Sequence, residues 1–134
     1  MSTNDAVVDT CFDAQPNEVW RAITSPDGVG QWMGEGSSLP PSTGSELWLR
    51  DFVTGVPREG RVRSVDPDHH ITFDWWPEDR PDQQSTVDIT LEPLHSGTRV
   101  RVVEHAGLAV ARTVHASAWA WRSACLGLSS SRVR

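Results

Sequence analysis

The sequence contains no tyrosine and no lysine, only two cysteines, and no long apolar run. Two thiols do not make a disulfide framework, and the ~20 consecutive apolar residues of a membrane span are missing. The 12 basic residues, all arginines, are outnumbered by 18 acidic ones, so the net charge is −6. A nucleic-acid footprint needs clustered positive charge, and the polar N-terminus has no signal-peptide profile. We therefore predict a cytoplasmic protein that binds neither nucleic acid nor membrane.

Seven tryptophans stand out within an apolar content of 37 %. Indoles fill a core, or line a cavity, with large rigid faces that have few rotamers. A chain of 134 residues is long enough to bury roughly two-thirds of its unfolded surface as one domain. We predict a single domain over residues 1–134, with flexible ends at 1–5 and 129–134.

Alternating apolar and polar residues predict six β-strands. They are expected at residues 6–12, 45–51, 58–65, 71–76, 85–92 and 98–105. Two short helices should follow the first strand. The first has Pro16 in its first turn, and the second begins at Ser25, a capping residue followed by Pro26. This grouping of helices favours an antiparallel α+β sheet over a parallel layout.

Residues 111–128 are expected to form a long amphipathic helix. Apolar residues recur there at spacings of four, three, four and three, at Val114, Ala118, Trp121, Cys125 and Leu128. Such a stripe must be covered, and the preceding strands can supply a curved sheet. The predicted fold class is therefore α+β, a curved six-stranded antiparallel sheet around a long C-terminal helix, with two short helices after the first strand.

Several motifs in order carry a family resemblance. The early ones are Phe12-x3-Pro16-x2-Val19-Trp20-x-Ala22-Ile23-Thr24-x-Pro26 and Gln31-Trp32-Met33-Gly34. The later ones are Gly60-x-Val62-x2-Val65-x-Pro67, Ile71-x-Phe73-x-Trp75 and Gly97-Thr98-x-Val100-x-Val102-x-Glu104-His105. Together they resemble the activator of heat-shock-protein-90 ATPase homologue family of the START-like, or SRPBCC, superfamily. The resemblance extends over about residues 6–128.

The resemblance implies a helix-grip fold with a cavity between the sheet and the C-terminal helix. Such cavities commonly hold apolar small molecules or lipids, and in some branches they perform cyclase or aromatase chemistry. Bacterial relatives suggest a homodimer, for which Trp76 is a candidate contact. The family name comes from co-chaperones that carry an additional, larger chaperone-binding domain. This chain has no room for that domain, so a chaperone partner is unproven.

Glu104 is the polar residue of greatest interest. It shares a predicted strand face with Val100 and Val102, which should point into the concave side of the sheet. A carboxylate there would be desolvated, and it could hydrogen-bond a ligand or act as a general acid or base. Alternatively, it pairs with an arginine such as Arg63 or Arg50, or lies at the wet edge of the sheet. Glu104 is the one named catalytic candidate, and an enzyme would use it together with a nearby histidine or arginine.

Tryptophans around this face could wall an apolar or aromatic pocket, although such residues are more often core. Alternation prevents Trp75 and Trp76 from facing the same side, and an outward Trp76 could mark a subunit contact. The predicted ligand-binding residues are Trp32, Trp48, Phe73, Trp75, Val102, Glu104, Ala118 and Trp121.

No metal or cofactor is expected. His105 and His115 are ten residues apart across a loop, which is not ligand spacing. A Gly-x-Ser-x-Gly elbow is missing, and the glycines at 28, 30 and 34 are off-pattern for dinucleotide binding. Three hypotheses remain: a ligand-binding domain anchored by Glu104, an enzyme of cyclase, aromatase or hydrolase type, and a protein-interaction module.

Overall fold

A computed structural model describes residues 5–50, 55–106 and 130–131, and the structural statements below concern these residues. The N-terminal part forms β1 (Asp5–Phe12), α1 (Pro16–Thr24) and α2 (Pro26–Trp32). The remaining strands are β2 (Glu46–Arg50), β3 (Pro57–Asp66), β4 (His70–Pro77), β5 (Ser85–Leu94), β6 (Gly97–Ala106) and β7 (Ser130–Ser131). The predicted helix over residues 111–128 lies outside the described residues.

Both short helices begin where local sequence signals predict. In α1, the Glu18 side chain accepts a hydrogen bond from the backbone N–H of Gln15 at 3.2 Å, which holds the first turn. In α2, the Ser25 hydroxyl accepts from the backbone N–H of Gly28 at 3.2 Å, so the predicted cap is confirmed. Gly28 also lets the helices approach, because a Cβ there would lie 1.9 Å from the carbonyl oxygen of Ala22.

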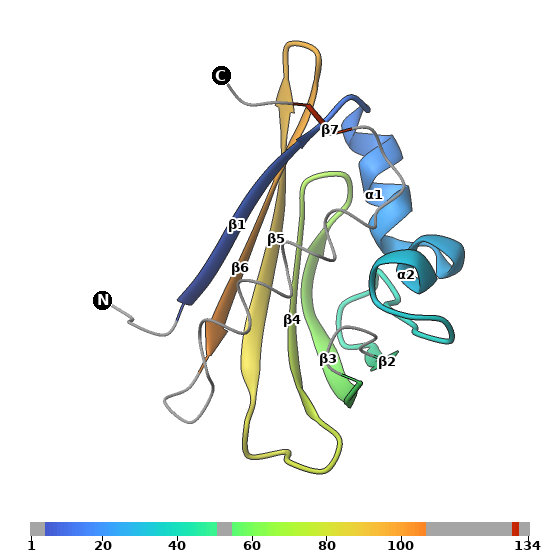
Figure 1. The fold of residues 1–134 in the computed structure, drawn as a ribbon, viewed down its shortest axis with the longest axis vertical. Helices are drawn as coiled ribbons and strands as arrows, with labels where there is room; N and C mark the ends of the chain where they lie inside the picture. Colours follow the sequence, from blue (N-terminus) through green and yellow to red (C-terminus); the bar gives the residue numbers. More distant parts are fainter. Residues whose placement is uncertain (1–4, 51–54, 107–129, 132–134) are drawn as a thin grey trace.

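The strands form one antiparallel sheet in the order β2-β3-β4-β5-β6-β1-β7 (Figure 1). All six predicted strands are confirmed, but the count of six is one short, because Ser130–Ser131 pairs with Phe12 and Cys11 as a seventh strand. The sequence predicts a flexible end over residues 129–134, which includes these two serines. A two-residue strand has no alternation to detect, so only its pairing with β1 identifies it.

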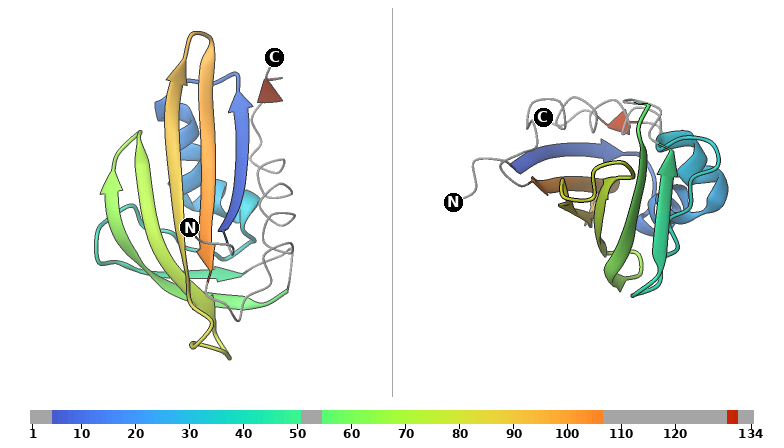
Figure 2. Two further views of the ribbon diagram at one scale, coloured as in Figure 1. Left: turned by 90° about the vertical axis from the view of Figure 1, so that its left-hand side faces the viewer. Right: turned by 90° about the horizontal axis from the view of Figure 1, so that it is seen from below.

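The sheet is strongly bent. Figure 2 shows β2 and β3 turned across the direction of β1, β5 and β6, with α1 and α2 grouped on one side of the sheet. Helix α1 packs against β5 and β6. At one end of β6 the Thr98 hydroxyl donates to the carbonyl oxygen of Ala14 at 2.7 Å, which fastens the start of α1 to the sheet. The bend creates a concave inner face and a convex outer face.

Alternate residues of the central strands lie on the two faces. In β4, Ile71, Phe73 and Trp75 are buried, whereas the residues between them are half-buried. Trp75 and Trp76 therefore face opposite sides, as alternation predicts. The inner-face residues join Val19 and Ile23 of α1, and Val29 and Trp32 of α2, in one hydrophobic core. The inner face is thus the packed side of the sheet, and the outer face carries its polar side chains.

Candidate functional site on the inner face

Four polar or aromatic side chains meet at one end of the inner face. They come from four neighbouring strands: Arg58 from β3, Trp75 from β4, Ser85 from β5 and Glu104 from β6. Strand register brings them together, because Trp75 is paired with Ser85, and Glu104 is paired with Val87 on the same strand as Ser85. We call this set the inner polar end.

Glu104 lies at the centre of the inner polar end and is only 1 % exposed. Its Oε2 atom accepts a hydrogen bond from the indole Nε1 of Trp75 at 2.7 Å and another from the hydroxyl of Ser85. The same indole nitrogen lies 2.9 Å from the Ser85 oxygen. Burial of a carboxylate is costly unless it is hydrogen-bonded, and bonds to an ionised acceptor are stronger than neutral ones. The three side chains therefore stabilise one another in the interior.

Arg58 supplies a second buried charge at this end and is 8 % exposed. Its Cζ atom lies 4.5 Å from the centre of the Trp75 ring, so the guanidinium stacks on the indole that binds Glu104. Arg63 and Arg50, the partners of Glu104 that the sequence suggests, have other described partners. Arg63 instead forms an ion pair with Asp74, and Arg50 lies over the Trp48 ring.

The signal for Arg58 and Ser85 was present in the alternation of the predicted strands. Arg58 is four residues before Val62, and Ser85 is two residues before Val87, so each shares a face with a buried valine. The sequence alone does not connect them with Glu104, because only the order of the strands decides which strands lie side by side.

An apolar wall continues from the inner polar end. Phe73 packs edge-to-face on Trp75 with ring centres 5.7 Å apart, and Val102 lies beside Ile89 on the next strand. All of these side chains are buried. The structure therefore brings together four of the predicted ligand-binding residues: Phe73, Trp75, Val102 and Glu104.

The other predicted ligand-binding residues do not join this group in the described structure. Trp32 is buried in the core on α2, where its indole nitrogen donates to the carbonyl oxygen of Ile23 at 3.2 Å. Trp48 lies on the outer face, because the alternation of β2 turns Leu47 and Leu49 inward instead. Its indole nitrogen donates to Glu78. Ala118 and Trp121 lie outside the described residues.

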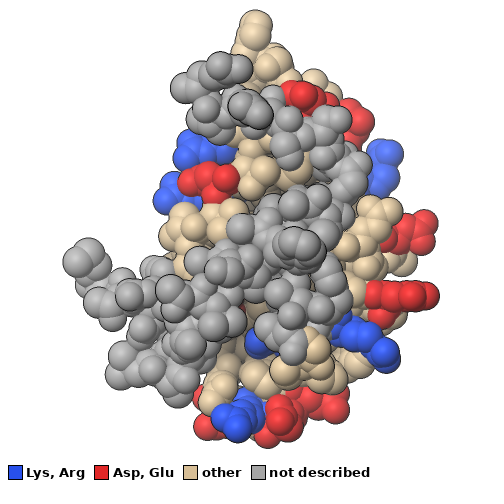
Figure 3. All heavy atoms as spheres, in the orientation of Figure 1, with Lys and Arg blue, Asp and Glu red and all other residues tan. Residues whose placement is uncertain are grey.

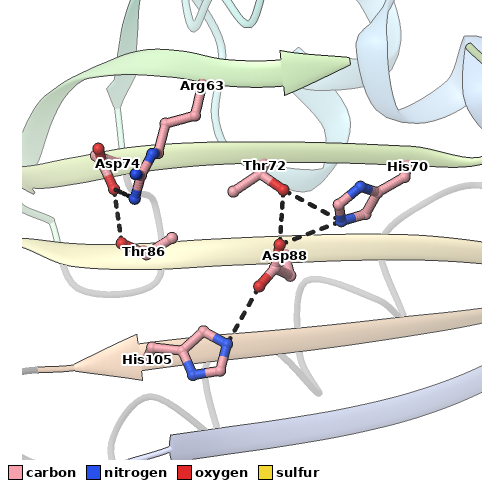
Figure 4. A network of polar contacts seen from close by, with 7 residues as sticks. All are labelled: Arg63, His70, Thr72, Asp74, Thr86, Asp88 and His105. Carbon is pink, nitrogen blue, oxygen red and sulfur yellow. Dashed lines mark hydrogen bonds and ion pairs between the residues drawn. The ribbon is translucent and has the colours of Figure 1, made fainter. Parts of the chain in front are cut away.

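A second polar network occupies the outer face of the same strands (Figure 4). The carboxylate of Asp88 on β5 accepts from the Thr72 hydroxyl at 2.6 Å. Its two oxygens each lie 3.1 Å from an imidazole Nε2, one of His70 and one of His105. An ionised carboxylate has no donor, so the imidazole nitrogens donate. We call these four residues the outer network.

The outer network changes the acidity of its central carboxyl group. Burial, the largest single influence, raises the pKa of Asp88. The hydrogen bonds from Thr72 and His70, the charge of His70 and the hydrogen bond from His105 act in the opposite direction. Together they hold the pKa of Asp88 below its ordinary value.

His105 contacts Asp88 on the outer face, whereas Glu104 lies on the inner face. These two residues are neighbours in the sequence but belong to separate networks.

Two further features describe the surface. Two hollows of about 500 and 340 Å³ adjoin at Pro26 and Ser37, beside α2 and the loop that follows it. They lie away from the inner polar end.

In Figure 3, basic and acidic side chains are interspersed along the lower and right-hand edges of the visible face. Within the described part of the chain, no group of His, Cys, Asp and Glu side chains is placed to hold a metal ion.

Comparison with known proteins identifies relatives of this architecture. A model of the family described as Activator of Hsp90 ATPase homolog 1-like protein matches residues 13–128. A search of curated proteins found no match. The described helices include none long and apolar enough to cross a bilayer.

Solved structures give the same architecture. Protein MLL2253 from Mesorhizobium loti is 22 % identical, with a TM-score of 0.79 over 91 % of this chain and 93 % of that one. The Aha1 dimer from Colwellia psychrerythraea is 20 % identical, with a TM-score of 0.76 over 91 % and 92 %. DynU16, from the dynemicin biosynthetic locus, is 24 % identical, with a TM-score of 0.78 over 92 % of this chain but 45 % of its own. At these identities the likeness shows the fold.

Proposed function

We propose, from the premise that the chain belongs to the Activator of Hsp90 ATPase homolog 1-like family, that it binds a small molecule on the inner face of its sheet. The ligand is an apolar or aromatic compound or a lipid. Its apolar body contacts Phe73, Trp75 and Val102, and a polar group reaches Glu104. The α+β fold of the family is the basis for this class of function.

The observation that carries the proposal is the burial of Glu104 beside an aromatic wall. Burying a carboxylate costs stability unless other groups compensate, and here Trp75 and Ser85 are directed at one of its oxygens. A leucine at this position would complete the apolar face without that cost. Ligand sites combine an apolar lining with a few placed polar groups, and the inner face has this composition.

The structural neighbours add support from another direction. DynU16 is a protein of the dynemicin biosynthetic locus, which connects one protein of this fold with small-molecule chemistry. This chain matches less than half of DynU16, so the connection supports the class of ligand and no particular compound.

The test is a thermal-shift screen of the full chain against fatty acids and polycyclic aromatic compounds. A ligand at ~100 times its dissociation constant adds about 2.7 kcal/mol of stability, which raises Tm by several degrees at this size. We expect binding that weakens in Glu104→Gln and is unchanged in Asp88→Asn, the matched control on the outer face. A panel with no stabilising compound, or a shift insensitive to Glu104→Gln, would refute the proposal.

A homodimer is the second candidate property, because the Aha1 protein from Colwellia was solved as a dimer. Trp76, half-buried on the outer face of β4, is the contact that the sequence suggested. Light scattering during size-exclusion chromatography measures the mass. We expect Trp76→Ser to shift a dimer toward the monomer, and a wild-type protein that elutes as a monomer at all concentrations would exclude this property.

A further inference from the structure

We infer that the outer face of β2, β3 and β4 is the contact surface between two copies of this chain, and that Glu59 of each copy pairs with Arg61 of the partner subunit. This inference rests on the homodimer proposed above and specifies its interface. It depends on a row of side chains that crosses the three strands, and on two exposed charges of opposite sign on the middle strand.

Two tryptophans flank one glutamate on this face. Glu59 of β3 is paired with Trp48 on β2 and with Trp76 on β4, so the three residues form a row across adjacent strands. Glu59 is exposed, and both tryptophans are half-buried. Tryptophan is enriched among the residues that contribute most to protein–protein binding. The row therefore offers apolar surface on both sides of a charge.

The Trp48 side chain is already held in one orientation. Its indole nitrogen donates to Glu78 at 3.3 Å, and the guanidinium Cζ of Arg50 lies 5.5 Å from the centre of its ring. A side chain that is ordered before association loses less conformational freedom when a partner binds. Within the described residues, no hydrogen bond occupies the indole N–H of Trp76. This donor is therefore available to a second copy.

The middle strand supplies two charges without partners. Glu59 and Arg61 are both exposed, and neither side chain forms an ion pair or a hydrogen bond with the described residues. The next arginine on this face differs, because Arg63 forms an ion pair with Asp74 at 3.6 Å (Figure 4). Residues two apart on a strand lie about 7 Å from each other on the same face. A second copy can therefore supply the opposite charge to both side chains at once.

The symmetry of a dimer selects how the two copies are arranged. In a two-fold interface both subunits use the same patch, so a contact from one residue to another occurs twice. With the axis along the strands, Glu59 would face Glu59 and Arg61 would face Arg61, which places like charges together. With the axis across the strands at the level of Gly60, Glu59 faces Arg61 of the partner subunit. The charges favour this second arrangement.

Reversal of each charge tests the pairing in the full chain. Sedimentation equilibrium measures the mass and the Kd of the dimer. We expect Glu59→Arg and Arg61→Glu each to weaken the dimer by roughly ten-fold or more, because like charges then meet twice in the interface. The double variant with both substitutions restores opposite charges, so its Kd should return to within about three-fold of the wild-type value.

Arg101→Glu is the matched control. Arg101 is exposed on the outer face of β6, three positions from β3 in the strand order, and its reversal changes the net charge as Arg61→Glu does. Its dimer Kd should equal that of the wild type. All of the substituted side chains are exposed, so far-UV circular dichroism should show the wild-type fold in each variant.

The outcomes separate this interface from the homodimer itself. A wild-type protein that sediments as a monomer at all concentrations would refute both. A dimer whose Kd is unchanged by either single variant forms through another surface, which would overturn the inference and leave the homodimer in place. Single variants that dissociate the dimer without recovery in the double variant would overturn the pairing of Glu59 with Arg61.

Discussion

Strands β4, β5 and β6 carry one multiply hydrogen-bonded carboxylate on each of their two faces. On the inner face, Glu104 is 1 % exposed and accepts from Trp75 and Ser85. On the outer face, the side chain of Asp88 is 32 % exposed and accepts from Thr72, as well as from His70 and His105. In both sites a carboxylate accepts several hydrogen bonds from neighbouring strands, but the two carboxylates are buried to different extents.

The comparison shows that burial and the type of donor decide how strongly each carboxylate network depends on its hydrogen-bond partners. Water can replace a lost partner on the outer face, but on the inner face a lost partner leaves a buried polar group unsatisfied. The donors also differ, because two imidazoles and a hydroxyl bind Asp88, whereas an indole and a serine hydroxyl bind Glu104. The stability of the outer network therefore depends on the ionisation of Asp88, and that of the inner polar end depends on its buried partners.

The largest expected effect comes from removing the inner carboxylate. Glu104→Leu removes the carboxylate that accepts from the Ser85 hydroxyl and from the indole N–H of Trp75, and it removes the negative one of the two buried charges in the described residues. We expect a loss of about 3 kcal/mol in the free energy of unfolding, measured by denaturant titration. Asp88→Leu on the outer face should cost on the order of 1 kcal/mol. Equal losses would show that burial does not distinguish the two networks.

The next effect tests how tightly the inner face is packed. Gly60 is paired with Trp75, and a Cβ at this position would lie 2.0 Å from the carbonyl oxygen of Asp74 and 2.9 Å from Leu47 Cδ1. Gly60→Ala should therefore destabilise the chain by about 2 kcal/mol, measured by denaturant titration.

The matched control for this substitution is Gly30→Ala in α2. A Cβ at Gly30 would lie 3.9 Å from the Cα of Glu35, which is ordinary van der Waals contact. Alanine is favoured over glycine within a helix by roughly 0.5–1 kcal/mol, so this variant should be as stable as the wild type or more stable. A Gly60→Ala protein with wild-type stability would show that the strands can separate at this point.

A third effect, of about the same size, isolates one hydrogen-bond donor. Trp75→Phe keeps an aromatic ring but removes the N–H that lies 2.7 Å from Glu104 Oε2. We expect a loss of about 2 kcal/mol in the free energy of unfolding, because a charge-assisted bond is lost and a smaller ring fills the site. Trp48→Phe removes an exposed bond to Glu78 and should cost less than about 1 kcal/mol. Thermal and denaturant unfolding of both variants measure the difference.

The smallest effect concerns pH. The pKa of Asp88 is lowered in the folded state, so its ionised form stabilises the fold above the ordinary pKa of 3.8, and this contribution is lost as the pH falls through the folded value. Asp88→Asn should be less stable than the wild type by about 1 kcal/mol at pH 7. The difference should shrink toward zero near pH 2. A constant difference across this range would separate the stability of the outer network from the ionisation of Asp88.

Signals between residues close in the sequence were sufficient to predict most of the helices and strands. The cap at Ser25, the proline in the first turn at Pro16 and the alternation along the strands each act over a few residues. The short helices and six strands could therefore be predicted. For the same reason, the opposite faces of Trp75 and Trp76 were predictable. The strand at Ser130–Ser131 was not, because a two-residue strand is defined only by its partner.

The candidate site was predicted in part. Alternation with Val100 and Val102 placed Glu104 on the inner face, and it placed Phe73 and Trp75 on one strand face. Its partners, Trp75 and Ser85, lie 29 and 19 residues away in the sequence, so only strand register reveals them. Residue type alone does not predict where Trp48 lies. A tryptophan is suited to a pocket wall, but the alternation of β2 places its side chain on the outer face.

The amino-acid sequence by itself determined which residues form strands and helices, which face of each strand is apolar, and that a carboxylate interrupts one apolar face. These properties depend on neighbours along the chain, where propensity, capping and alternation act. The tertiary structure alone decided that Arg58, Trp75, Ser85 and Glu104 meet, and that Asp88 gathers two histidines on the opposite face. Both groups depend on the order and register of the strands, which are set by the packing of the whole sheet.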